Sequence, residues 1–147
     1  GFNLRGGELV APPQKEASKQ MTAQQIYESA LSLLPTRTSE DNSLAVYVPG
    51  WINLALQEAL ASENSIRASK GLLLLDKAPT VLSMTDEIPY SDELVRTALI
   101  YFLASLICKD DDDAYWSQDY RRRYISALAE YSRVCVDNIV DVYGGES

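Results

Sequence analysis

The run of residues from Leu94 to Cys108, LVRTALIYFLASLIC, constrains the fold more than any other part of this chain. Only Arg96, Thr97 and Ser105 interrupt its apolar side chains, so a helix formed from it has little face to offer water. Such a helix is about 22 Å long, which falls short of a bilayer that needs roughly 20 apolar residues, and acidic residues flank both ends. The run therefore predicts a buried core helix that other elements must surround.

Both ends of this helix carry boundary signals. We expect Ser91 to cap the first turn with its hydroxyl, while Asp92 and Glu93 place negative charge at the positive end of the helix dipole. At the far end, Lys109 suits the negative end of the dipole. An acidic run follows and predicts a solvated link that also caps the next helix; it consists of Asp110, Asp111, Asp112 and Asp113.

Composition bounds the class of protein. A chain of 147 residues is expected to form one domain and to bury roughly two-thirds of its unfolded surface. The net charge of −8 argues against a protein that holds nucleic acid through a basic face, because that affinity comes from neutralised phosphates. An acidic wall along which DNA slides without being retained is still compatible with this charge.

The residue types needed for common catalytic chemistry are missing. The chain has no histidine, which removes the most frequent general base and most catalytic zinc sites. Its two cysteines, Cys108 and Cys135, lie in apolar helical patterns without CxxC spacing and predict buried thiols, with a disulfide or metal role as the lesser alternative. None of the motifs GxxxxGK, GxGxxG, GxSxG and HExxH occurs, so the sequence predicts no catalytic site and no cofactor.

The first twenty residues form a segment apart. They contain Gly6-Gly7 and Pro12-Pro13 and too few apolar side chains to fold alone, so we divide the chain into an arm over residues 1–21 and a helical domain over residues 22–147. Two interpretations stay open: a disordered leader, or an arm that becomes ordered on a partner. The arm contacts would be Phe2, Leu4, Leu9 and Val10. No signal peptide or transmembrane run is recognised, which predicts an intracellular protein or part of an assembled particle.

The fold class expected is all-α, with a bundle-like core of four helices. The first helix covers residues 23–34 and begins with a capping box formed by Thr22 and Gln25. The second covers residues 44–62, or starts at Pro49 as a first-turn proline. A short β-hairpin or extended insertion over residues 72–83 precedes the core helix. The second helix is expected to turn these side chains inward: Tyr47, Trp51, Leu54, Ala55, Leu56 and Ala59.

The fourth helix, residues 114–143, is expected to be about twice as long as the core helix, at roughly 45 Å. Its apolar residues recur every three or four positions, and its last turns should extend beyond the bundle. Apolar side chains exposed there indicate a docking surface for a partner. The predicted docking residues are Val134, Val136, Ile139, Val140, Val142 and Tyr143.

Two charged clusters invite a functional interpretation. The acidic run does not fit a calcium-binding EF-hand loop, because Tyr115 and Arg121 occupy the positions of the loop glycine and the closing glutamate. We interpret it as a solvated capping turn, with divalent-cation binding and paired-carboxylate catalysis as lesser alternatives. The basic cluster is interpreted as a solvated helix face paired with Asp119 and its neighbours, or as an intersubunit contact with the acidic run of the next copy. It consists of Arg121, Arg122 and Arg123.

The order of these features resembles the head-to-tail connector, or adaptor, proteins of tailed bacteriophages. The resemblance covers about residues 22–135. A helix with Pro49-Gly50-Trp51-Ile52-Asn53 is followed by an extended insertion and then by Asp86-Glu87-Ile88-Pro89-Tyr90, which leads through Asp92-Glu93-Leu94 into the apolar helix. The acidic run and the aromatic stretch from Tyr115 to Tyr124 come next.

The resemblance implies a structural protein of the virion neck without enzymatic activity. Such proteins form a homo-oligomeric ring, commonly dodecameric, beneath the portal protein at the head-tail junction, after assembly in the host cytoplasm. The ring extends the DNA channel, through which DNA passes without specific binding, and it provides the surface for the next neck or tail protein. No membrane partner is implied. The alternative is a small intracellular helical module that binds one protein through its C-terminal helix.

Overall fold

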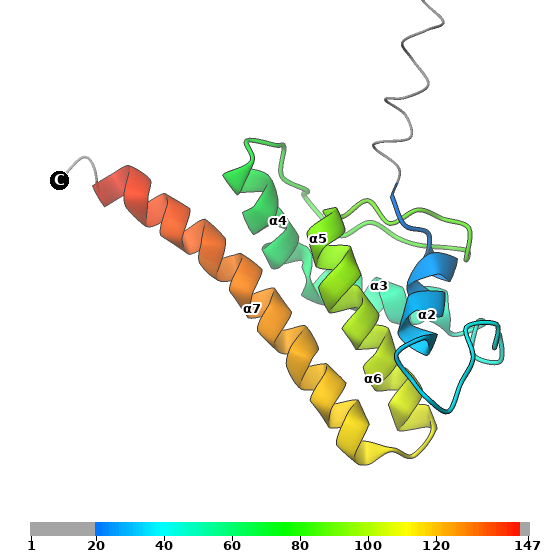
Figure 1. Cartoon of the computed structure of the whole chain (residues 1–147). Helices are drawn as coiled ribbons and strands as arrows, with labels where there is room; N and C mark the ends of the chain where they lie inside the picture. Colours follow the sequence, from blue (N-terminus) through cyan, green and yellow to red (C-terminus); the bar gives the residue numbers. More distant parts are fainter. Residues whose placement is uncertain (1–19, 145–147) are drawn as a thin grey trace, which may run out of the picture.

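The computed structural model describes residues 20–144, with side chains as far as Ser132. Apart from one isolated β-bridge between Thr22 and Glu87, this part of the chain holds no β-structure, so the all-α prediction is confirmed. Figure 1 shows its helices grouped around one central rod, with α7 laid along one side. The elements in order are α2 (Ala23–Leu31), α3 (Val48–Glu58), α4 (Leu60–Ser69), α5 (Asp92–Leu94), η1 (Val95–Leu99), α6 (Ile100–Asp110) and α7 (Ala114–Gly144).

The central rod is the continuous run of α5, η1 and α6, and it is buried as the sequence predicts. Leu99 and Leu103 are almost completely enclosed, with α2, α3 and α7 packed against the rod. The polar interruptions are satisfied locally: the hydroxyl of Thr97 donates to the Glu93 carbonyl at 2.8 Å, and that of Ser105 donates to the Phe102 carbonyl at 2.7 Å. A π-helical turn, η1, lies within the rod.

The start of the rod differs from the prediction. The Ser91 hydroxyl makes no cap; instead it donates to Oε2 of Glu63 at 3.1 Å, and the Ser91 amide donates to Oε1 at 2.8 Å. Glu63 is only 1% exposed, and Arg67 pairs with its carboxylate at 2.7 Å. A carboxylate from α4 thus satisfies the amide at the positive end of the rod, where negative charge is favourable. Neighbouring side chains could not reveal this, because Glu63 is 28 positions from Ser91.

Helix α2 begins as predicted and ends earlier. The capping box is present: the Gln25 amide donates to the Thr22 hydroxyl at 3.2 Å, and the Thr22 amide donates to the Gln25 side chain at 2.9 Å. The helix ends at Leu31 rather than Leu34, although Leu34 remains buried in the turn that follows. The apolar pattern in the sequence extends beyond the end of the helix, because the turn that follows α2 also contributes a side chain to the core.

The second predicted helix is two helices. Pro49 lies in the first turn of α3, and the chain breaks at Ala59 before α4. Tyr47 and Leu54 were expected to face inward but are 56% and 60% exposed, because Tyr47 precedes the helix and Leu54 lies outside the stripe of every third or fourth residue that α3 turns to the core. Trp51 is half-buried and stacks on Tyr47. The inward residues of α3 and the break are Val48, Ile52, Ala55, Leu56 and Ala59.

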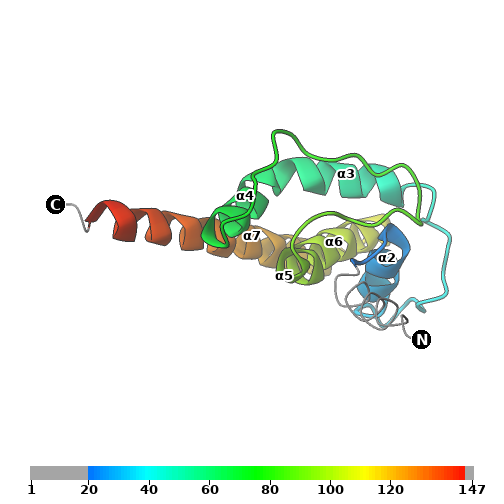
Figure 2. The same ribbon diagram turned by 90° about the horizontal axis from the view of Figure 1, so that it is seen from above.

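The segment between α4 and α5, residues 72–91, is extended and forms no hairpin within the described chain; we call it the strap. Two asparagines hold its backbone. Asn53 donates to the Val81 carbonyl at 2.9 Å and accepts from the Val81 amide at 2.7 Å. Asn64 does the same with Leu75, at 3.0 and 2.8 Å. Figure 2 shows the strap running out along α3 and returning to α5.

The returning strap also fixes the entry to α2. The Ile88 amide donates to the Met21 carbonyl at 2.9 Å, and the Ala23 amide donates to the Asp86 carbonyl at 3.0 Å. The Asp86 carboxylate accepts the amides of Leu82 and Ser83, which lowers its pKa. Residues 20–22 are thereby held antiparallel to residues 86–88.

Helix α7 begins at Ala114 as predicted and has 31 residues, roughly 46 Å. The Trp116 amide donates to the Asp113 carboxylate at 3.2 Å, so the acidic run caps this helix as expected. The Ser62 hydroxyl donates to the Leu128 carbonyl at 2.8 Å and joins α4 to α7. Figures 1 and 2 both show the last turns of α7 continuing past α4, so the predicted extension beyond the bundle is present in the backbone.

Replacing Leu103 with alanine should lower the free energy of unfolding by about 2–5 kcal/mol, because it leaves a cavity inside the central rod's packing. Leu82→Ala is the matched control, since Leu82 is 82% exposed, and should change the free energy by less than about 0.5 kcal/mol. Urea denaturation of both variants measures the difference. Equal effects would contradict the central position of the rod.

Candidate functional site

A network of ion pairs surrounds Arg37, in the loop between α2 and α3. Its Nε and Nη2 donate to the two carboxylate oxygens of Asp111, and Nη2 also donates to Asp110 at 3.3 Å. Its Nη1 donates to Asp41 at 3.3 Å and to the Ser43 hydroxyl at 3.2 Å. Every donor of the guanidinium group therefore has an acceptor. The network ties the loop to the turn between α6 and α7.

This network changes the interpretation of the acidic run. The sequence predicts a solvated capping turn, and Asp113 does cap α7, but Asp110 and Asp111 face Arg37. Asp112 adopts a φ of 60°, a left-handed conformation in which aspartate is tolerated better than most residues. No group of three or more metal-ligating side chains is placed to hold an ion within the described residues.

A cleft of about 820 Å³ lies beside the Arg37 network. Leu34, Cys108 and Tyr120 supply apolar wall, and Trp116 lines it while 42% exposed. Burial and, to a lesser degree, the nearby carboxylates of Asp113 and Asp111 together raise the pKa of the Cys108 thiol to about 11. The thiol therefore stays protonated near neutral pH and is a poor nucleophile.

The basic cluster pairs within its own chain. Arg122 and Arg123 both donate to Asp119, and Arg121 lies 3.6 Å from the Glu58 carboxylate. The predicted pairing with Asp119 is thus confirmed. The intersubunit contact stays a prediction: the three side chains are between 48% and 68% exposed, with Arg122 the most open.

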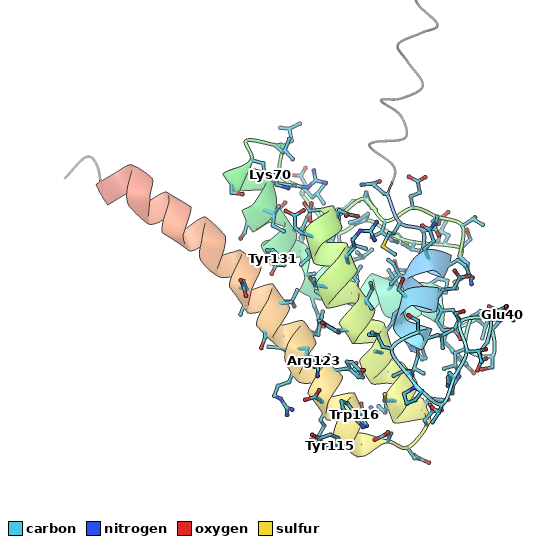
Figure 3. The ribbon with its side chains drawn as sticks, in the orientation of Figure 1. Glu40, Lys70, Tyr115, Trp116, Arg123 and Tyr131 are labelled. Carbon is cyan, nitrogen blue, oxygen red and sulfur yellow. The ribbon has the colours of Figure 1, made fainter. Side chains whose placement is uncertain are left out.

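An aromatic row follows the first turns of α7. Tyr115 meets Trp116 edge to face, Trp116 packs against Tyr120, and Tyr120 stacks on Tyr101 of α6, with centroids 5.2 to 6.1 Å apart. Arg123 lies over the rings of Tyr101 and Tyr120. Figure 3 shows Tyr115, Trp116 and Arg123 along this half of the helix. The helical spacing of Trp116 and Tyr120 predicts that they share one face of α7. It does not predict that Tyr101 of α6 packs against them.

A second surface was not anticipated from the sequence. The strap presents exposed leucines, and Leu73 is 87% exposed. The short apolar runs suggested paired strands with one covered face, whereas the asparagine contacts hold the backbone and leave these side chains outside. The available signal was Asn53 in the second helix, a polar residue beside the buried Ile52. The exposed leucines are Leu72, Leu73, Leu74 and Leu82.

The side chains of two predicted groups, the arm contacts and the docking residues, lie outside the described part of the chain. The arm contacts, Phe2, Leu4, Leu9 and Val10, lie outside the described residues. The backbone of the docking segment is helical as far as Gly144. The side chains of the docking residues, Val134, Val136, Ile139, Val140, Val142 and Tyr143, lie outside the described part of the chain.

Comparisons with known protein families, with curated proteins and with solved structures give no match for this chain. None of the described helices combines the length and the apolar character needed to span a membrane. The geometry described above is therefore the basis for assigning a function. Among the described residues, Arg37 and Glu63 are held in ion pairs and the Cys108 thiol is protonated, while the aromatic row and the strap present exposed side chains.

Replacing Arg37 with methionine should lower the free energy of unfolding by about 2 kcal/mol, because Asp110 and Asp111 lose their charged donor and repel each other. Arg96→Met is the matched control: Arg96 also pairs with an aspartate, but both side chains are more than half exposed, so its effect should stay within about 0.5 kcal/mol. Denaturation at low and high salt measures both. Equal effects would show that the network does not anchor the loop.

The raised pKa of Cys108 predicts a loss of stability at alkaline pH. An unfolded thiol loses its proton above pH 9.0, whereas the folded one does so only above about 11. The stability that the buried, protonated Cys108 thiol contributes to the folded state is therefore fully present below pH 9 and is lost as the pH rises toward 11. Cys108→Ala should show a shallower fall in unfolding free energy over that window. Identical slopes for the two proteins would contradict the burial of the thiol.

Proposed function

We propose that this chain is a structural head-to-tail connector of a tailed bacteriophage. In this proposal, copies form a ring under the portal protein, extend the DNA channel and provide the docking surface for the next neck or tail protein. The observation that carries the proposal is the last part of α7, which continues past the bundle that supports its first half. A helix that leaves its own domain is suited to contact another subunit.

The stretches that carry the resemblance to connector proteins also have defined positions in the fold. Asp86 and Ile88 hold the entry to α2, Tyr90 donates to the Leu56 carbonyl at 2.5 Å, and Asn53 clamps the strap. These residues therefore build the scaffold from which α7 extends. The contacts that hold this scaffold are made within one chain, which is compatible with assembly from folded monomers.

Charge supports the same assignment. The chain carries a net charge of −8, which is unsuited to holding DNA and suited to a channel wall that lets DNA pass. Arg122 is 68% exposed and Asp110 is 51% exposed, so the basic cluster of one copy is accessible to the acidic run of another. A contact that joins two different surfaces of identical subunits repeats around an axis and can close a ring.

The proposed roles follow from these positions. The docking residues on the extension of α7 contact the portal protein, and the arginine cluster bridges to the acidic run of the adjacent copy. The protein then belongs to the virion neck and has no enzymatic role. Binding of an unrelated protein by a single copy is the alternative function, and it would use the same extension of α7.

The purified full-length chain, alone or mixed with the portal protein of the same phage, should form a ring of about a dozen copies. Ending the chain after Arg133 should leave the central rod and its partners folded but abolish the complex with the portal. Mass photometry and electron microscopy measure the assembly, and circular dichroism checks the fold. A full-length chain that remains a monomer or dimer under both conditions would refute the connector assignment.

A charge reversal separates assembly from folding in the same experiment. Arg122→Glu should weaken ring formation and leave the melting temperature nearly unchanged, because Arg122 is 68% exposed and its pair with Asp119 is a surface pair. Arg96→Glu is the control, since it reverses an arginine of the rod that is 59% exposed and also pairs with an aspartate. Loss of assembly in both variants would indicate a general effect of charge rather than a contact.

A further inference from the structure

A groove lies between the start of the strap and the start of the central rod. Its volume is about 1010 Å³, and Gln20, Leu72, Leu73 and Glu93 are among its lining residues. Lys70 pairs with Glu93 at 2.9 Å within it. The lining carries equal numbers of acidic and basic side chains, three of each. Apolar contact with the leucines, rather than net charge, is therefore what the groove offers to an occupant.

The wall formed by the strap has unused binding capacity. Leu72 and Leu73 are 53% and 87% exposed, and the amides of Leu73 and Leu74 donate to no described residue. The two neighbouring amides are satisfied, by the Arg67 carbonyl at Leu72 and by Asn64 at Leu75. An extended backbone with free amides and apolar side chains favours an extended peptide as its occupant.

The chain itself delivers a peptide to this groove. Thr22 and Glu87 form an antiparallel bridge, so Gln20 lies opposite Pro89 and the chain at Gln20 points toward Tyr90 and the groove. Gln20 also lines the groove. Residues 1–19 are attached at this point, and they include a short apolar stretch, Leu9-Val10-Ala11-Pro12-Pro13.

We propose that residues 9–13 occupy this groove of their own chain, with Leu9 and Val10 against Leu72 and Leu73. The linker, residues 14–19, spans up to roughly 20 Å when extended, which allows the stretch to reach the strap. Pro12 and Pro13 favour an extended backbone, so little conformational entropy is lost on binding. A short tether gives an effective concentration in the millimolar range, which favours the same chain over a second copy.

Disulfide trapping in the full-length chain tests this contact. In a Cys108→Ala, Cys135→Ser background, Val10→Cys with Leu73→Cys should form a bond within one chain about tenfold faster than Val10→Cys with Leu82→Cys. Leu82 is the matched control because it is 82% exposed on the same strap. Non-reducing gels and peptide mapping distinguish the products. Equal rates, or bonds formed only between chains, would overturn the proposal.

Amide hydrogen exchange of the full-length chain provides a second test that needs no cysteine. The double variant Leu9→Asp, Val10→Asp should accelerate exchange at Leu73 and Leu74 about tenfold relative to the wild type, because the occupant is lost. Lys15→Ser, a change in the linker, should leave both rates unchanged. The proposal holds for an isolated copy, so its outcome is independent of ring assembly. Equal exchange in the wild type and the double variant would overturn it.

Discussion

Exclusion of water from residues 94–108 is the constraint on which the rest of the structure depends. The rod is apolar on almost every side, so α2, α3 and α7 must all lie against it. Polar contacts made far along the chain secure both ends of the rod: Glu63 of α4 accepts the Ser91 amide at its start, and Arg37 of the α2–α3 loop pairs with Asp111 at its end. Burial of the rod drives the packing, and these contacts fix its geometry.

The buried polar groups near the start of the rod make hydrogen bonds and ion pairs that fix its packing. Glu63 pairs with Arg67 and accepts the Ser91 amide, and the donors of Arg67 also reach the carbonyls of Leu73 and Pro89. Breaking such a buried pair is expensive because the remaining charge is left without a partner. Glu63 and Arg67 therefore stabilise the packing of α4 and the strap against the start of the rod.

The sequence sufficed for the parts of the fold that depend on local patterns. The rod, the capping box at Thr22 and the length of α7 follow from periodicity and neighbouring residues. It did not suffice where a distant side chain decided the outcome. Glu63 replaces the expected Ser91 cap, and of the two forms expected for residues 72–83, a hairpin or an extended insertion, the contacts of Asn53 and Asn64 hold the extended one. Tyr47 and Leu54 were expected inside because they are apolar, but Tyr47 precedes α3 and Leu54 lies on its outer face.

The candidate site shows the same division. Asp113 caps α7 as its position relative to the helix predicts, and Asp119 pairs with the arginines within one turn. The pairing of Asp111 with Arg37 joins positions 74 residues apart, and no local pattern signals it. The exposure of the strap leucines was likewise not predictable, because short apolar runs usually indicate buried segments.

The asparagine clamps on the strap have an evolutionary consequence. Asn53 and Asn64 form hydrogen bonds with the backbone of Val81 and Leu75, so these contacts do not depend on the side chains of the strap. Substitutions at Leu73 or Leu74 can therefore accumulate without disturbing the scaffold. The exposed face of the strap is thus free to change in sequence while the helices beneath it keep their packing.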